Sequence, residues 1–293
     1  MLKTSNFTSK EVISLSDEIA VVGVQDTPLV SLLLANRRVE QATAPVHSWR
    51  AKTLDDTADI SVAEGNENVT VYSSARAELS NVCQIFEKGV SISGSALASS
   101  VKSIGDLFAS EVADRLVEVK VAIEKAVTSG VYNDGSTTPY IRRMRGIENW
   151  VDSANVVNAA TTGVVDENEL IETVQKLWDN GINGTYIAVC NATIKSQINA
   201  LYKNSHRYVN QPTQWGVVVD VLQTDFGNVQ FVLSRHATPN KLTIFPLEYV
   251  ALVWLRDPTF ELLGKIGDAE RGHVVAEATL KVATPKAVAQ YVI

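Results

Sequence analysis

The chain has few cysteines, no long apolar run and no excess of basic residues. Its 293 residues include two cysteines, Cys83 and Cys190, and two cysteines in an intracellular protein are usually buried free thiols. No stretch approaches the roughly 20 apolar residues of a membrane span. The segment from Met1 to Ser16 lacks the apolar core of a secretory signal. We therefore expect a protein that is made and kept in the cytoplasm, with no membrane partner.

The charge balance also limits the class of protein. Lysine and arginine number 26 against 33 acidic residues, a net charge of −7. A protein that grips nucleic acid with its whole surface needs concentrated basic residues, so only local phosphate contacts remain open. The hydrophobic content of 45% and charged content of 20% are those of a folded protein with one large domain or two smaller ones.

Catalytic and metal-binding motifs are missing or isolated. The Asp225–Gly227 tripeptide occurs in protein kinases, but no glycine-rich phosphate loop or His-Arg-Asp motif accompanies it. We interpret it as a turn between strands. The histidines lie far apart in the sequence and neither cysteine belongs to a CxxC pair; they are His47, His206, His236 and His273. We predict no catalytic residue, no cofactor and no metal.

One long amphipathic stretch organises the rest of the chain. Apolar residues recur every three or four positions from 104 to 128, which predicts a helix with one apolar face. They are Ile104, Phe108, Val112, Leu116, Val119, Ile123 and Val127. The opposite face is predicted to carry Glu111, Asp114, Glu118, Lys120, Glu124 and Lys125. Ser103 and Asp106 resemble a capping box, and Ser129-Gly130 provides a stop.

The residues before this helix predict an arm and a hairpin. Pro28 fits the first turn of a short helix, and residues 47–52 alternate as a strand does. A polar, acidic run from 53 to 68 separates residues 47–52 from a second alternating stretch, 69–72. A two-stranded ribbon is marginal alone, so the predicted hairpin needs another surface, which another subunit could supply.

Residues 152 to about 260 predict a compact α/β domain, because helical and strand patterns interleave there. Asp166 and Glu169 form a capping box for a helix through Trp178. Further along, we predict strands at 185–190, 216–221, 229–234, 241–245 and 249–255 and a helix at 192–202. The tail, 274–282 and 287–293, predicts a hairpin or two strands of a small sheet.

An arginine cluster stands between the long helix and this domain. Arg142, Arg143 and Arg145 lie close to Trp150 in the sequence. Such a cluster can bind phosphate, and it can also form a solvated or salt-bridged loop, which is the commoner case. The sequence leaves both readings open.

Four sequence motifs occur in a characteristic order. They are Asn81-Val82-Cys83-Gln84-Ile85-Phe86 with Ser93-Gly94; Arg142-Arg143-Met144-Arg145-Gly146; Thr224-Asp225-Phe226-Gly227; and Trp254-Leu255-Arg256-Asp257-Pro258-Thr259-Phe260 with Lys265 and Gly267-Asp268-Ala269-Glu270. With the order of arm, hairpin, long helix, α/β domain and terminal strands, they resemble the major capsid protein of tailed bacteriophages. The closer resemblance is to the family of the major head protein of phage SU-ten, from roughly Trp49 to the C-terminus.

The resemblance implies an α+β chain with the Hong Kong 97-type capsid fold. It implies an N-terminal arm (1–45), an extended β-hairpin loop (46–80), a peripheral domain (81–151) with a spine helix (104–128), an α/β axial domain (152–260) and peripheral-domain return strands (261–293). The implied function is a major capsid protein that self-assembles through pentamers and hexamers into an icosahedral shell around phage double-stranded DNA. The implied location is the virion, with assembly in the host cytoplasm.

The implied partners are other copies of the chain, a portal, separate scaffold or decoration proteins, and packaged DNA held by non-specific contact. The family supplies no active site, so the candidate site residues concern assembly alone. They are Trp49, Arg50, Lys52, Asp55, Asp56, Glu64, Arg142, Arg143 and Arg145. Some relatives crosslink a loop lysine, a position that Lys52 resembles, but without an identifiable partner we predict no crosslink. Two alternatives remain: an encapsulin-like compartment shell, and an α/β enzyme built on residues 152–260.

Overall fold

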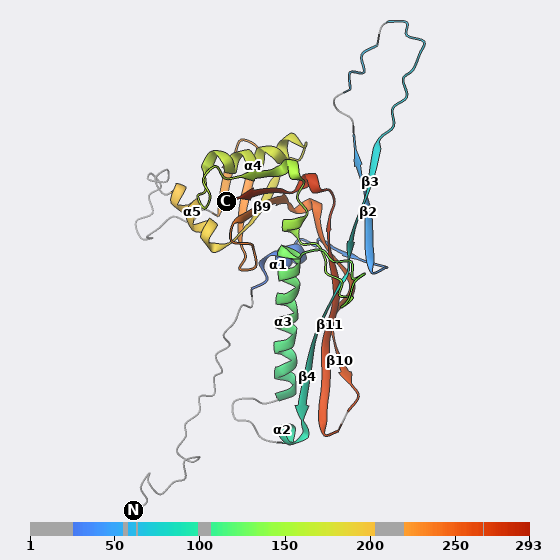
Figure 1. Cartoon of the computed structure of the whole chain (residues 1–293), viewed down its shortest axis with the longest axis vertical. Coiled ribbons are helices and arrows are strands. Elements are labelled where there is room, and N and C mark those ends of the chain that lie inside the picture. Colours follow the sequence, from blue (N-terminus) through green and yellow to red (C-terminus); the bar gives the residue numbers. More distant parts are fainter. Residues whose placement is uncertain (1–25, 55–57, 63, 99–106, 203–219, 266) are drawn as a thin grey trace, which may run out of the picture.

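The computed structural model describes residues 26–54, 58–62, 64–98, 107–202, 220–265 and 267–293. The chain is α+β, as predicted (Figure 1). Its α-helices are α1 (Pro28–Ala35), α2 (Gly94–Ala98), α3 (Leu107–Ser129), α4 (Glu167–Asp179) and α5 (Ala192–Tyr202). Its strands are β1 (Val39–Gln41), β2 (Val46–Thr53), β3 (Ala75–Val82), β4 (Gln84–Ser93), β5 (Val156–Asn158), β6 (Thr185–Cys190), β7 (Val221–Thr224), β8 (Gly227–Leu233), β9 (Lys241–Pro246), β10 (Val250–Leu263), β11 (Ala269–Val282) and β12 (Ala289–Val292). Short 3-10 helices at 147–149, 153–155, 247–249 and 285–287 join them.

The long helix α3 lies along a four-stranded sheet of order β1-β10-β11-β4 (Figure 1). Its apolar face packs on the sheet, and Val119, Ile123 and Val127 share one buried cluster with Phe86 of β4 and Val274 of β11. The prediction of this helix is confirmed from residue 107 to its end at Ser129. Residues 104–106 and the predicted Ser103 and Asp106 cap lie outside the described residues.

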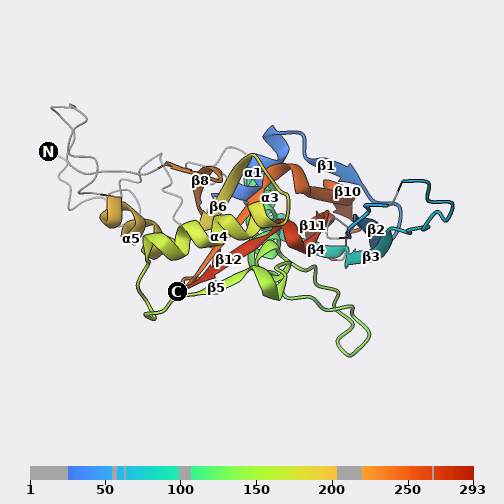
Figure 2. The same ribbon diagram turned by 90° about the horizontal axis from the view of Figure 1, so that it is seen from above.

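A six-stranded sheet, of order β5-β12-β9-β6-β8-β7, forms a second unit with α4 and α5 (Figure 2). The predicted strand 185–190 and helix 192–202 are confirmed with the same bounds. Asp166 caps α4 as predicted, its carboxylate accepting hydrogen bonds from the amides of Asn168 and Glu169. The Glu169 side chain does not complete the capping box, because it binds the Tyr291 hydroxyl and the Ala160 amide instead.

Two predicted strand placements are wrong. Strand β10 follows the six-stranded sheet in sequence but pairs with β11 and β1 in the other sheet. The tail does not form a hairpin, because β12 leaves β11 and enters the six-stranded sheet between β5 and β9. Ala289, Gln290 and Tyr291 are buried, so β12 needs a sheet covered on both faces. The chain therefore crosses between the two units three times, before β5, before β10 and before β12.

Two further strand predictions have different outcomes. The stretch 69–72 is not a strand, because β3 begins only at Ala75 and pairs with β2 up to Thr53. The predicted strand 216–221 lies outside the described residues except for its end, where Val221 begins β7. Asp225 and Phe226 form the turn between β7 and β8, as predicted, and Gly227 begins β8.

Glu124 of α3 departs from the predicted amphipathic pattern. Its side chain is fully buried, and its two carboxylate oxygens accept hydrogen bonds from the amides of Leu29 and Val30 at 3.0 and 2.7 Å. These amides belong to the first turn of α1, where helix geometry supplies no acceptor. Burial raises the pKa of Glu124, and the two hydrogen bonds oppose the shift. Glu124 therefore fastens α1 to the long helix.

We expect Glu124→Ala to destabilise the unassembled chain by about 2–4 kcal/mol, because two buried amides lose their acceptors. Asp114→Ala, on the exposed side of the same helix, is the matched control and should change stability by about 0.5 kcal/mol or less. Denaturant unfolding followed by circular dichroism measures both. Equal effects would show that Glu124 has no special role.

The raised pKa of Glu124 also gives a pH dependence. A carboxyl whose pKa is higher in the folded chain stabilises it fully below the unfolded pKa, and this stabilisation is lost as pH rises through the folded pKa. The difference in unfolding free energy between wild type and Glu124→Gln should therefore shift against wild type as pH rises above the usual range of a glutamate, about 4. A pH-independent difference would contradict this expectation.

Candidate assembly interface

The hairpin of β2 and β3 projects from the body of the protein (Figure 1). The two strands pair from Val46 opposite Val82 to Thr53 opposite Ala75. Because alternate residues share a face, one face carries Arg50 opposite Glu78 and Lys52 opposite Arg76, all four exposed. Two cations directly opposite each other repel, so this face favours an acidic partner.

The opposite face of the hairpin packs on the body. Trp49 lies across from Leu79, and both are partly buried against the main core cluster. The Trp49 ring stands 5.5 Å from the Trp150 ring, measured between centroids. Trp49 thus anchors the hairpin root within its own chain, whereas Arg50 and Lys52 point to the surface.

The first two motifs of the capsid resemblance meet at this root. The buried amide group of Asn81 donates to the carbonyl oxygens of Arg145 and Leu280 and accepts from the amide of Arg145, at 2.7 to 3.1 Å. Gln84 accepts from the amide of Met144 at 3.1 Å. Gly146 lies so close to the end of α3 that a Cβ there would stand 2.5 Å from the nitrogen of Gly130. These contacts clamp the hairpin, the arginine segment and α3 together.

The three candidate arginines have different surroundings. Arg142 donates to Glu277 at 2.8 Å, and Arg256 contacts the other oxygen of this buried carboxylate at 3.1 Å. The guanidinium of Arg145 lies over the Trp150 ring at 4.7 Å and over the Tyr132 ring at 5.2 Å. Arg143 is exposed. The salt-bridged interpretation therefore holds for Arg142, and Arg143 is available for contacts outside the chain.

Beyond the paired strands, the hairpin continues as an open loop. Its exposed apolar side chains are Leu54, Ile60, Val62, Val69, Val71 and Tyr72, with Val69 and Val71 exposed to 86% and 88%. Glu64 is exposed among them, whereas Asp55 and Asp56 lie outside the described residues. Apolar groups gathered in this way mark an interaction surface.

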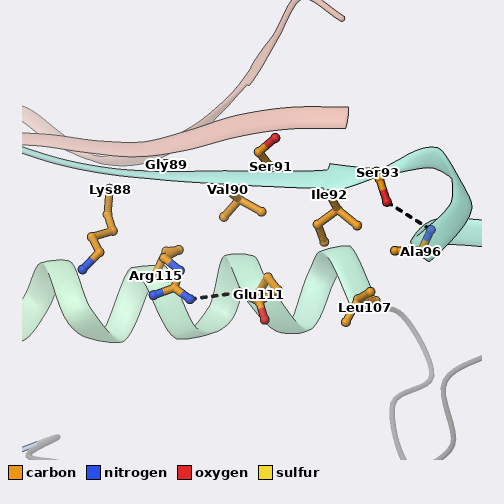
Figure 3. Close-up of a pocket in the computed structure, with 10 residues that line it drawn as sticks. All are labelled: Lys88, Gly89, Val90, Ser91, Ile92, Ser93, Ala96, Leu107, Glu111 and Arg115. Atoms are coloured by element: carbon orange, nitrogen blue, oxygen red, sulfur yellow. Dashed lines mark hydrogen bonds and ion pairs between the residues drawn. The ribbon is translucent and has the colours of Figure 1, made fainter. Parts of the chain in front are cut away.

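A groove of about 650 Å³ runs along β4, the last strand of its sheet. Its lining comprises residues 88–93 of β4, Ala96 of α2, and Leu107, Glu111 and Arg115 of α3. Figure 3 shows Val90 and Ile92 pointing toward α3 and Ser91 pointing away. Since successive residues of a strand face opposite sides, a lining of consecutive residues means that the groove follows the backbone edge of β4.

The described residues contain little that resembles a chemical site. Both cysteines are free and buried, as predicted, and burial raises the pKa of each thiol to about 11. Within the described ranges, no group of three His, Cys, Asp or Glu side chains is placed to hold a metal ion. No described helix has the length and apolar character needed to cross a membrane.

The sequence did not reveal three of the groups that organise this region. Glu124 and Glu277 are buried carboxylates, and Asn81 joins three segments distant in sequence. Glu277 occurs in an alternating stretch between apolar neighbours, where a polar residue is expected to face solvent. Only the apolar residues at 123, 126 and 127 around Glu124 hint that it lies on the covered side of the helix.

Solved structures with a similar fold include capsids of phages and of a GTA particle. The chain from the capsid asymmetric unit of cyanophage A-1(L) matches with a TM-score of 0.76 and 10% identity, covering 99% of each chain. A capsid chain of the native GTA particle matches with a TM-score of 0.72 and 11% identity, covering 99% of this chain and 98% of that one. The capsid chain of cyanophage P-SCSP1u matches with a TM-score of 0.66 and 12% identity, covering 99% of this chain and 96% of that one. At these identities the likeness establishes the fold alone.

Family membership rests on the sequence. No curated protein matches the chain, but the profile of the family described as SU10 major capsid protein matches residues 3–292. This family consists of structural proteins that form the icosahedral shell of tailed phages, and it confirms the resemblance drawn from the four motifs. The structural function also sets aside the α/β enzyme alternative. The chain belongs to the SU10 major capsid protein family.

Proposed function

We propose that copies of this chain form pentamers and hexamers that close into the shell around double-stranded DNA, and that the hairpin loop of each copy lies over a neighbouring subunit. The observation that carries this proposal is the loop between β2 and β3. Its apolar side chains are exposed in the single chain, while its root is held by Asn81 and Trp49. A fixed root and an unburied tip suit contact with a second copy.

The two sheets support a division of the subunit into a peripheral and an axial domain. The four-stranded sheet with α3 corresponds to the proposed peripheral domain with its spine helix, and most of the six-stranded sheet comes from the proposed axial domain. The proposed boundary between the axial domain and the return strands, at residues 260 and 261, does not match the packing. Strand β10 packs with the four-stranded sheet although most of it precedes this boundary, and β12 packs with the six-stranded sheet although it follows it. In this proposal the axial units meet around the five-fold and six-fold axes.

Further partners follow from the same proposal. Packaged DNA would be held by non-specific phosphate contact, for which Arg143 is an exposed candidate. A portal and separate scaffold or decoration proteins complete the partner set, with assembly in the host cytoplasm. An encapsulin-like compartment would need a cargo enzyme in place of portal and DNA, and the family match favours the phage shell.

Deletion of residues 55–67 tests the loop assignment. We expect the variant to remain soluble and folded but to form no shells, because the shortened loop no longer reaches over a neighbouring subunit. Sedimentation and negative-stain electron microscopy, compared with circular dichroism of the unassembled chain, measure both properties. Shells in wild-type yield would refute the assignment.

Asn81→Ala tests the clamp at the hairpin root. Loss of its side-chain hydrogen bonds, at about 0.5–1.5 kcal/mol each, should destabilise the chain by roughly 2–4 kcal/mol and lower the melting temperature of assembled shells. Ser80→Ala, at the exposed neighbouring position, is the control and should leave both the stability of the chain and the melting temperature of the shells unchanged. Identical melting curves for the two variants would contradict a role for the clamp.

A further inference from the structure

The loop contains a stretch that has the composition of a strand but no strand partner among the described residues of its own chain. Residues 68–72, Asn-Val-Thr-Val-Tyr, alternate β-branched and aromatic residues. In the structure they form no strand, and no backbone hydrogen bond joins Val69–Tyr72 to another described segment. The described residues of the two limbs of the loop do not pair, and they line an open space of about 770 Å³. The backbone donors and acceptors of this stretch are therefore open to a partner outside the chain.

The groove along β4 exposes an unpaired strand edge, which is what an added strand needs. Strand β4 pairs with β11 on one side only, and residues 85–93 make no backbone hydrogen bond to any other described segment. The opposite side of the groove is the first half of α3, with Leu107, Glu111 and Arg115. An exposed strand edge of this length is a template for pairing with another chain. A single extended segment would complete the sheet beneath the helix.

The other open edge of this sheet is less suited to pairing. Strand β1 covers β10 only from Leu252 to Trp254. Beyond this point β10 has two irregularities in register, and Pro258 lies within the second. Bulges and prolines are features by which natural edge strands avoid pairing. Strand β4 has neither between Ile85 and Ser93, so it is the edge available for a strand.

We propose that residues 68–72 of one copy add as a strand to the β4 edge of a second copy. This inference rests on the proposed function and specifies its loop contact. In this arrangement Val69 and Val71 extend the apolar face formed by Val90 and Ile92 and face α3. Thr70 faces the other way, on the side of Ser91. Main-chain hydrogen bonds supply affinity, and the alternating side chains fix the register.

Charge agrees with this choice of occupant. Residues 54–74 contain five acidic residues and no lysine, arginine or histidine. The groove lining contains two cations, Lys88 and Arg115, and one acid, Glu111. These cations bind Glu118 and Glu111 at the surface, with side chains between 25% and 51% exposed. Exposed pairs are worth little, so loop acids such as Glu67 can replace them as partners.

Proline substitution tests the main-chain contact. Thr70 and Val71 are exposed and do not pair with any strand in the described part of the chain, so proline there should leave its fold intact. Adjacent amides of a strand point to opposite edges, so one of Thr70→Pro and Val71→Pro must remove a donor to β4. We expect that variant to lower the yield of shells at least tenfold, while Val62→Pro, in the other limb, stays within twofold of wild type.

Cysteine pairs test the location. Thr70→Cys is combined in the full chain with Gly89→Cys, Ser91→Cys or Ser93→Cys, and shells are oxidised and run on non-reducing gels. Cross-strand Cβ atoms lie about 4.5–5.5 Å apart, so at least one pair should link chains into dimers and longer products. Ser61→Cys with Ser91→Cys is the control and should give none. The native thiols are buried.

Normal shell yields from both proline variants, or no linkage from any of the three pairs, would overturn the strand addition. These outcomes are distinct from failure of the proposed function, which requires that deletion of 55–67 also leave shells intact. If Ser91→Cys alone instead becomes linked to a different protein in virions, the groove has another occupant and the inference is wrong.

Discussion

The amide of Asn81 is the interaction on which the arrangement of the subunit depends. It binds the main chain of Arg145 and of Leu280, and so joins the hairpin root, the segment after α3 and strand β11. Pairing of β4 with β11 places the hairpin root beside β11, and the Asn81 side chain ties the segment after α3 to both. Once they are fixed, Trp49 reaches Trp150 and the hairpin leaves the body in one direction. The same side chain therefore sets both the core packing and the aim of the loop.

Buried carboxylates complete the junctions that hydrophobic packing leaves open. Glu124 accepts from the first turn of α1, and Glu277 binds Arg142 and Arg256. Removing one of these carboxylates costs more free energy than its interactions contribute, because the partner groups are then left buried and unpaired. These contacts therefore specify one arrangement of arm, helix and sheet more than they add stability. A subunit that must fit many identical neighbours benefits from such a single arrangement.

Local patterns predicted much of the fold. The 3.6-residue period gave α3, the Asp166 cap gave the start of α4, and the apolar run from Thr185 to Cys190 gave β6. The failures concern distant partners. Nothing near β10 or β12 states which sheet each joins, because the pairing residues lie in β1, β5, β9 and β11. Among the candidate site residues, Arg50, Lys52 and Glu64 are exposed. Arg142 forms a salt bridge, which was one of the two readings of its cluster, whereas the contact of Trp49 with Trp150 was not foreseen.

The strand predicted at 69–72 fails for a different physical reason. Its β-branched and aromatic residues favour an extended backbone, but an extended backbone becomes a strand only beside another strand. The described part of the subunit offers no such neighbour to the loop, and it also leaves the edge of β4 without one. Local preference and tertiary structure disagree in natural sequences mainly where function intervenes. In the strand addition proposed above, a second copy of the chain supplies the missing partner, and the local sequence of the loop then fits the assembled state better than the single chain.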